Sequence, residues 1–375
     1  MAVAPTVAGE AMDRRFMAAA IRLSRWHLGL TGENPSVGSL VVADIDGIPT
    51  IVGRGVTAIG GRPHAELQAL AEAGEAARGA TIYATLEPCS HIGKAPPCAD
   101  AIVAAGIRRV VVASLDPDIR VAGRGVSILK RAGIDIVTGC EEATARRVMA
   151  GFLTLKAKGR PFVTLKLAVS ADGKIGRVGA GQVSITGPIA RRAAQIMRVE
   201  HDAIMVGVQT VVEDDPLLTV RLDGLADRSP LRVVIDSQAR TPTTARMFAE
   251  RDCSRIMILS SNKAPGRAVE RLRDVGATVD TLTSDYKGRL EPREILRHLG
   301  VLGVKSVLLE GGAETARRFL DAGLVDRIAL FVSQTIVGDD GIASPVAEDG
   351  IPEGFVRRSE ETFGADRLID YERPF

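Results

Sequence analysis

The stretch that decides the fold reads Pro63-His64-Ala65-Glu66 and continues, after one helix-like and one strand-like segment, with Glu87-Pro88-Cys89 and Pro96-Pro97-Cys98. His64, Cys89 and Cys98 are zinc-type ligands, and three protein ligands leave a fourth coordination position for water. Glu66 is the wrong group for a fourth soft ligand, but a carboxylate beside such a metal can move protons to and from water. The stretch therefore predicts a catalytic zinc centre.

Isolated residues of these types are usually structural, so the combination carries the prediction. The His-x-Glu and Pro-Cys elements form the pattern of zinc nucleobase deaminases, although Cys89 and Cys98 are spaced more widely than the usual Cys-x-x-Cys. Each ligand follows a proline at an expected helix start, and the positive end of a helix favours the thiolate that zinc requires.

Longer motifs surround the ligands and make the comparison more specific. Four further motifs accompany the pattern: Thr85-Leu86-Glu87-Pro88-Cys89-Ser90-His91, Gly93-Lys94, Asn34-Pro35-Ser36-Val37-Gly38 and Val121-Ala122-Gly123-Arg124-Gly125. Together they closely resemble the deaminase half of the bifunctional riboflavin-biosynthesis deaminase/reductases. The resemblance implies that the substrate is bound by Asn34, His91, Lys94 and Asp116. Asp118 stands where that family usually has Asn.

The second half of the chain resembles the reductase half of the same family, which has a dihydrofolate-reductase-like fold. The motifs are Val163-Thr164-Leu165-Lys166-Leu167-Ala168, Gly207-Val208-Gln209-Thr210-Val211, Asp214-Asp215-Pro216-Leu217-Leu218-Thr219-Val220-Arg221 and Leu309-Glu310-Gly311-Gly312-Ala313-Glu314-Thr315. The resemblance implies an NADPH site formed by Ala168, Ser184, Thr210, Asp214, Ser237, Gly312, Ala313, Glu314 and Thr315. It implies substrate contacts from Gln182, Arg198, Leu218, Arg221 and Glu310. Ser184 stands where the family often has Trp.

The residues themselves say less about this half. Glu310-Gly311-Gly312-Ala313 follows an expected strand and opens a helix, so its amides can approach a dinucleotide phosphate. The same residues would also be expected in a tight strand-to-helix turn that binds no ligand. The half lacks a Gly-x-Gly-x-x-Gly after an early strand, which disfavours a Rossmann fold. Arg198 and Arg221 are the candidate phosphate forks.

Composition excludes several classes of protein. The chain has 375 residues, 46% of them apolar, which suggests two globular domains. A net charge of +2 and 3% aromatic residues give no reason to expect a nucleic-acid partner. We expect no membrane span and no secretion signal. Four cysteines are few, which is typical of a reducing cytoplasm. The sequence leaves the oligomeric state undecided, and a homo-oligomer is compatible with it.

Strand and helix patterns alternate on both sides of Gly159-Arg160-Pro161, which predicts an α/β fold in each half. We expect a flexible tail over 1–12, a cytidine-deaminase-like zinc domain over 13–152 and a dihydrofolate-reductase-like domain over 160–375. Asp13 is the expected N-cap of a helix over 13–27, and residues 141–158 read as one helix. The chain after 332 reads as irregular.

These observations predict a bifunctional enzyme that uses Zn²⁺ and NADPH on small phosphorylated pyrimidines. The first domain would deaminate the ring, and the second would reduce the ribosyl group to ribityl. Two alternatives remain. One is a single-activity tRNA or nucleoside deaminase with an unrelated second domain. The other is a binding module around a structural zinc, which would need a fourth protein ligand.

Overall fold

The computed structural model describes residues 7–90, 96–117, 122–249 and 255–374. The chain divides into two compact units, Met1–Gly159 and Arg160–Phe375. The division lies at the Gly159-Arg160-Pro161 segment. Gly159 takes a left-handed conformation (φ 64°) directly after helix α6 (Ala150–Lys158), and Pro161 cannot continue that helix.

The first unit is built on a five-stranded sheet with the order β2-β1-β3-β4-β5. β1 pairs antiparallel with β2 and β3, whereas β3, β4 and β5 are parallel. The strands are β1 (Gly38–Ile45), β2 (Ile48–Val56), β3 (Thr81–Leu86), β4 (Arg109–Ser114) and β5 (Asp135–Thr138). The parallel pairs require crossover helices, which the chain supplies between β3, β4 and β5.

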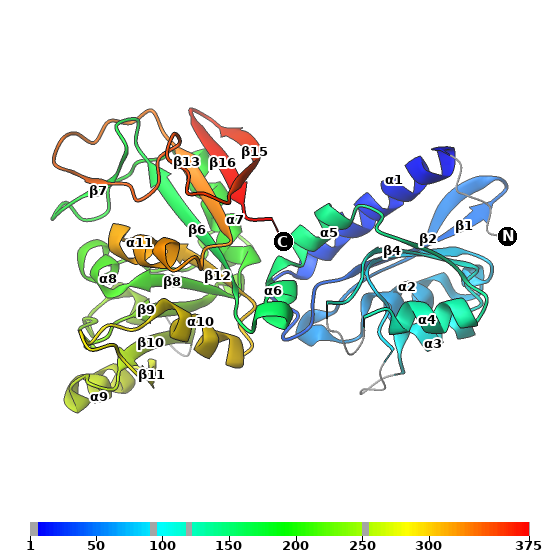
Figure 1. The fold of residues 1–375 in the computed structure, drawn as a ribbon, viewed down its shortest axis with the longest axis horizontal. Coiled ribbons are helices and arrows are strands. Elements are labelled where there is room, and N and C mark those ends of the chain that lie inside the picture. Colours follow the sequence, from blue (N-terminus) through cyan, green and yellow to red (C-terminus); the bar gives the residue numbers. More distant parts are fainter. Residues whose placement is uncertain (1–6, 91–95, 118–121, 250–254, 375) are drawn as a thin grey trace. The chain divides into compact units, whose positions relative to one another are not determined.

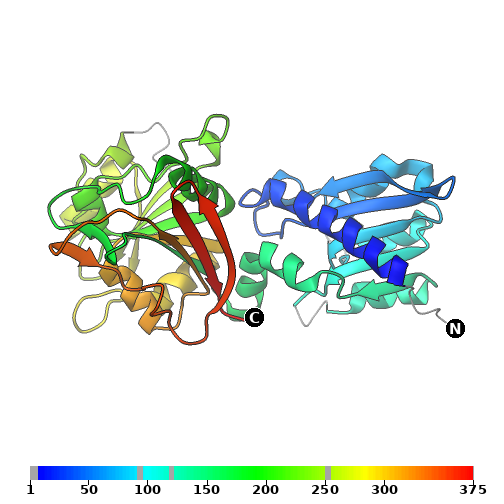
Figure 2. The same ribbon diagram turned by 90° about the horizontal axis from the view of Figure 1, so that it is seen from above.

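Helices cover both faces of this sheet (Figure 1). They are α1 (Val7–Ser24), α2 (Ala65–Ala73), α3 (Cys98–Ala104), α4 (Arg124–Arg131), α5 (Glu142–Val148) and α6. Successive strand side chains point to opposite faces, so Val111 of β4 packs with α1, α5 and α6. Val110 and Val112 pack with α2, α3 and α4. In Figure 2 the blue helix α1 runs across the strands on the first of these faces.

The second unit contains a nine-stranded sheet with the order β11-β10-β9-β8-β12-β6-β13-β16-β15. The strands from β11 to β13 in that order are parallel, and β16 and β15 add an antiparallel edge. The strands are β6 (Phe162–Val169), β8 (Ala203–Gly207), β9 (Leu231–Ile235), β10 (Ile256–Ser261), β11 (Thr278–Leu282), β12 (Ser306–Glu310), β13 (Arg327–Val332), β15 (Val356–Phe363) and β16 (Asp366–Glu372).

Helices again cover both faces. α10 (Pro292–Val301) and α11 (Ala313–Asp321) pack on one face. α7 (Pro188–Glu200), α8 (Val208–Asp214) and α9 (Gly266–Asp274) pack on the other. β7 (Lys174–Arg177) and β14 (Gly341–Ala343) form a separate two-stranded ribbon.

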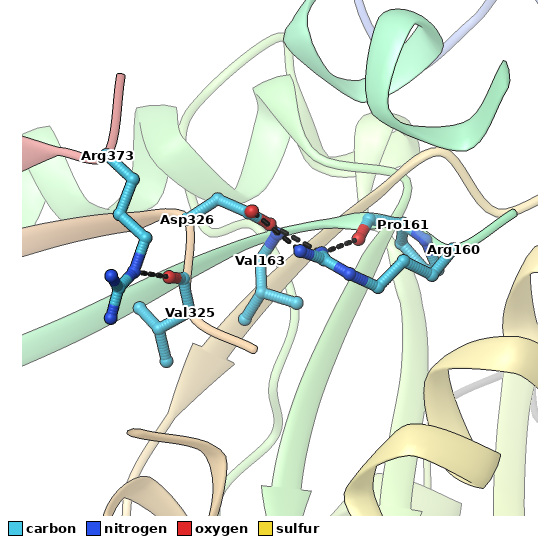
Figure 3. A network of polar contacts seen from close by, with 6 residues as sticks. All are labelled: Arg160, Pro161, Val163, Val325, Asp326 and Arg373. Atoms are coloured by element: carbon cyan, nitrogen blue, oxygen red, sulfur yellow. Dashed lines mark hydrogen bonds and ion pairs between the residues drawn. The ribbon is translucent and has the colours of Figure 1, made fainter. Parts of the chain in front are cut away.

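A network of polar contacts fixes the start of the second unit (Figure 3). Arg160 donates to both carboxylate oxygens of Asp326, at 2.6 and 2.8 Å, and the backbone N–H of Val163 donates to the same carboxylate at 2.9 Å. The backbone N–H of Arg373 donates to the carbonyl of Asp326. The network therefore joins the start of β6, the entry to β13 and the end of β16.

Three expectations about elements were wrong. α1 begins at Val7, so residues 7–12 are helical and Asp13 lies inside the helix, where it pairs with Arg109 at 2.7 Å. The helix expected over 141–158 is broken at Met149, which has non-helical dihedral angles. The stretch after 332 contains β15 and β16. Among the described residues, no helix is long and apolar enough to cross a membrane.

Candidate active sites

Local chain geometry brings the three expected metal ligands together. His64 is the N-cap of α2 with extended dihedral angles, Cys89 follows the end of β3, and Cys98 is the first residue of α3. Nδ1 of His64 lies 3.6 Å from Sγ of Cys89 and 3.4 Å from Sγ of Cys98. The ligand atoms of all three residues lie within 4.8 Å of one another.

These distances fit a zinc ion. Zn–S and Zn–N bonds of about 2.0–2.3 Å at tetrahedral angles place neighbouring ligand atoms about 3.3–3.8 Å apart. The His64–cysteine distances fall inside this range. In the described part of the chain, no fourth His, Cys, Asp or Glu joins the group, which argues against the closed site of a structural zinc. The residues therefore fit a catalytic zinc with an open position.

The thiols of this group are poised for metal binding. A hydrogen bond with Cys98 lowers the pKa of Cys89 to about 4, and the same contact raises the pKa of Cys98. The backbone N–H of Cys98, at the start of α3, donates to Sγ of Cys89 at 3.3 Å. The lowered pKa favours the thiolate form of Cys89, which is the form in which cysteine binds zinc.

Glu66 lies in the first turn of α2 and is only 4% exposed. Burial raises its pKa to about 7. Such a carboxyl group can both accept and donate a proton near neutral pH, which is what a general acid–base requires.

A cavity of about 1340 Å³ in the first unit is lined by His64, Glu66 and Cys89. Asn34 and Asp116 also line it. The Asn34 side chain packs against the backbone of Gly61. Any larger residue at position 61 would clash with it, because a Cβ there would be 2.2 Å from Nδ2 of Asn34. Asp116 follows β4 as Glu87 follows β3, and the carboxyl ends of neighbouring parallel strands share an edge. His91, Lys94 and Asp118 lie outside the described residues.

The second unit has its own cavity of about 460 Å³. Most of the expected reductase residues line it: Ala168, Gln182, Ser184, Arg198, Thr210, Asp214, Leu218, Arg221, Glu310, Gly312 and Ala313. Ser237, Glu314 and Thr315 do not line this cavity. Ser237 follows the end of β9, and the other two lie in the first turn of α11.

Two glycines form the turn that leads into α11. Gly311 and Gly312 have positive φ angles of 89° and 42°, which favour glycine. A Cβ on Gly311 would lie 2.8 Å from Oγ1 of Thr210, and a Cβ on Gly207 would lie 2.6 Å from Oγ1 of Thr315. Backbone amides at such a helix start can bind the phosphates of NADPH, so the residues present fit the cofactor.

Charged side chains meet beside these glycines, since Glu310 directly precedes Gly311. Nε and Nη2 of Arg198 donate to the two carboxylate oxygens of Glu310, each at 2.9 Å, and Nη1 donates to the carbonyl of Thr219. Burial would raise the pKa of Glu310, but the charges of Arg198 and Lys166 outweigh it and hold that pKa at about 2. The guanidinium expected to bind a phosphate therefore binds Glu310.

Lys166 also lines this cavity, and it was not among the residues predicted from the sequence motifs. Burial lowers the pKa of this ammonium group. The signal was present in the sequence, because Lys166 is the one charged residue of the buried parallel strand β6.

The fold and the two cavities define a two-domain enzyme with a zinc deaminase unit and a reductase unit. Residues 10–114 match the cytidine and deoxycytidylate deaminase zinc-binding region, and residues 161–365 match the RibD C-terminal domain. The second match excludes the alternative of an unrelated appended domain.

Curated relatives and solved structures are similar to this chain over nearly its whole length. The riboflavin biosynthesis protein RibD of Aquifex aeolicus is 38% identical, covering 96% of this chain and 99% of its own. The Escherichia coli protein of that name is also 38% identical, covering 88% and 89%. Acinetobacter baumannii RibD, form 1, has a TM-score of 0.83 at 33% identity, covering 98% of this chain and 100% of that one.

A Thermotoga maritima structure described as a diaminohydroxyphosphoribosylaminopyrimidine deaminase/5-amino-6-(5-phosphoribosylamino)uracil reductase has a TM-score of 0.82 at 32% identity, covering 97% and 99%. The chain belongs to the RibD family of bifunctional riboflavin-biosynthesis deaminase/reductases. The expected family, fold class and cofactors, Zn²⁺ and NADPH, are confirmed. The roles of individual substrate and cofactor residues stay predictions.

Proposed function

We propose that the chain catalyses two consecutive steps of riboflavin biosynthesis. The first is hydrolytic deamination of 2,5-diamino-6-(5-phosphoribosylamino)pyrimidin-4-one. The second is reduction of the ribosyl group of 5-amino-6-(5-phosphoribosylamino)uracil to ribityl. The observation that carries the proposal is the ligand group of His64, Cys89 and Cys98 with buried Glu66 beside it, on a chain that also holds a reductase cavity.

In the deaminase site, zinc supplies activation of water at neutral pH. His64, Cys89 and Cys98 would hold that zinc. Glu66 would accept a proton and return protons to the ring and the departing ammonia, since its pKa of about 7 suits both directions. Asn34 and Asp116 orient the pyrimidine from the cavity wall. His91 and Lys94 belong to the same proposed substrate site.

In the reductase site, NADPH supplies the hydride. Gly312, Ala313, Glu314 and Thr315 would hold NADPH through backbone amides at the start of α11, together with Ala168, Ser184, Thr210, Asp214 and Ser237. Lys166 donates a proton to the sugar oxygen as the ring opens, because burial weakens its hold on that proton. Glu310, kept ionised by Arg198, accepts a hydrogen bond from a sugar hydroxyl. Gln182, Leu218 and Arg221 complete the substrate side, Arg221 as the phosphate ligand.

We also propose a cytoplasmic enzyme that acts on small molecules, without a nucleic-acid partner. The support is a net charge of +2 with few aromatic residues and few cysteines. A homo-oligomer is compatible with this proposal, and light scattering after size-exclusion chromatography would measure its size.

The experiment that tests the function is incubation of the purified protein with the diamino substrate, with and without NADPH, followed by mass spectrometry. Without NADPH we expect a product in which one amino group has been exchanged for oxygen. With NADPH we expect that product to gain two hydrogen atoms. An unchanged substrate in both samples would refute the proposal.

A further inference from the structure

Helix α4 presents one face to the deaminase cavity. Arg124, Ser127, Ile128 and Arg131 all line the cavity and stand at positions i, i+3, i+4 and i+7 of the helix. This spacing places them on a single stripe. The proposed function assigns no role to this stripe, which carries two arginines.

The arginines of the stripe carry uncompensated charge. Among the described residues, neither Arg124 nor Arg131 has an ion-pair or hydrogen-bond partner for its guanidinium group. Arg62 and Lys156 add two more cations to the cavity wall. Four acids also line the cavity: Glu33, Glu66, Glu87 and Asp116. None of them belongs to α4; Glu66 stands beside the metal ligands, and the carboxylate of Glu87 accepts hydrogen bonds from backbone amides. The wall along α4 is therefore suited to an anion.

Glu87 fixes this helix relative to the metal ligands. It is 6% exposed, and its carboxylate accepts hydrogen bonds from the backbone N–H groups of Gly123 at 2.9 Å and Val126 at 3.2 Å. Gly123 is the N-cap of α4 and has no side chain to cap the helix, so Glu87 performs that task from another segment.

The packing at this point is close. A Cβ on Gly125 would lie 2.0 Å from the carbonyl oxygen of Pro88, the residue before Cys89. The start of α4 thus rests directly on the segment that carries a metal ligand. Arg124, the first residue of the helix, directly precedes Gly125 in this contact.

We propose that Arg124 binds the 5-phosphate of the substrate in the deaminase site, with Arg131 adding a second positive charge further along the same face. The inference rests on the proposed function, whose substrate has an uncharged ring at one end and a phosphate at the other. Arginine forms paired, charge-assisted hydrogen bonds with phosphate. About 10 Å of helix separates the two arginine Cα atoms, so the contribution of Arg131 is the more distant one.

The test compares Arg124→Gln and Arg131→Gln with the wild type on two substrates, the phosphorylated compound and its dephosphorylated nucleoside. Lys130→Gln is the matched control, because Lys130 is exposed on α4 and does not line the cavity. A charged hydrogen bond to phosphate corresponds to about a tenfold or larger change in affinity. We expect Arg124→Gln to raise KM at least tenfold for the phosphorylated substrate and to leave KM for the nucleoside unchanged.

Arg131→Gln should raise the same KM several-fold, and Lys130→Gln should behave as wild type. Zinc content and kcat should be retained in all three variants. Equal losses on both substrates would overturn the proposal, because they would mean that Arg124 supports the fold. An unchanged KM would also overturn it and assign the phosphate to another part of the cavity. A wild-type protein that does not deaminate the phosphorylated compound would instead refute the proposed function, and the subsite with it.

Discussion

Replacing Arg198 by alanine tests how the reductase cavity holds a buried charge. Arg198 and Glu310 form two parallel hydrogen bonds of 2.9 Å, and their side chains are only 11% and 12% exposed. Removing the arginine leaves the carboxylate buried with Lys166 and Arg221 as the cations that still act on it. Breaking a buried pair in this way typically costs about 3–5 kcal/mol.

We expect the free energy of unfolding of the reductase unit to fall by roughly that amount at pH 7, measured by denaturant titration. Arg297→Ala is the control, since Arg297 and Glu294 form an exposed pair on α10, with 64% and 46% of their side chains accessible. Such exposed pairs contribute only about 0–1 kcal/mol.

The pH dependence gives a second measurement. The folded pKa of Glu310 is about 2, below its ordinary value of 4.5. Its contribution to stability is therefore present above 4.5 and is lost as the pH falls towards 2. Arg198→Ala should flatten this loss. The reasoning would be refuted if Arg198→Ala were as stable as Arg297→Ala and had a raised KM for the phosphorylated substrate. Arg198 would then be a phosphate ligand and not the residue that keeps Glu310 ionised.

Two further predictions concern other parts of the molecule. Cys98→Ser should lose zinc and deaminase activity, because a hydroxyl is a poor ligand for this metal; elemental analysis showing full zinc occupancy would mean that the third ligand is wrong. Asp326→Asn should destabilise the second unit by up to about 3–5 kcal/mol, since it breaks the pair with Arg160, which is 13% exposed, and disturbs the contact with Val163. A denaturation midpoint equal to that of the wild type would contradict the role of the contacts in Figure 3.

Elements with strong local signals were predictable. Cys98 begins α3 because Pro97 precedes it, and β3, β4 and β12 are short apolar runs that follow the strand pattern expected from the sequence. The metal ligands could be predicted because histidine and cysteine chemistry is specific and their motifs are local.

The errors came from long-range contacts and from exposed elements. Asp13 looked like a helix cap, but Arg109, far along the chain, compensates its charge inside α1. β15 is exposed along almost its whole length and rich in Arg and Glu, so it lacks the alternation that marks a strand. The pairing of Arg198 with Glu310 joins two residues distant in the sequence, and no local motif reports it.

The measurement that tests the account most directly is deamination by Glu66→Gln. Glutamine keeps the shape of the side chain but cannot carry the proton, so the rate should fall by at least about 10²–10⁴-fold. Zinc should stay bound, and the reductase should still convert the deaminated intermediate supplied from outside. Glu75→Gln, an exposed change just beyond α2, should leave all three properties intact. Deamination at the wild-type rate by Glu66→Gln would contradict the account.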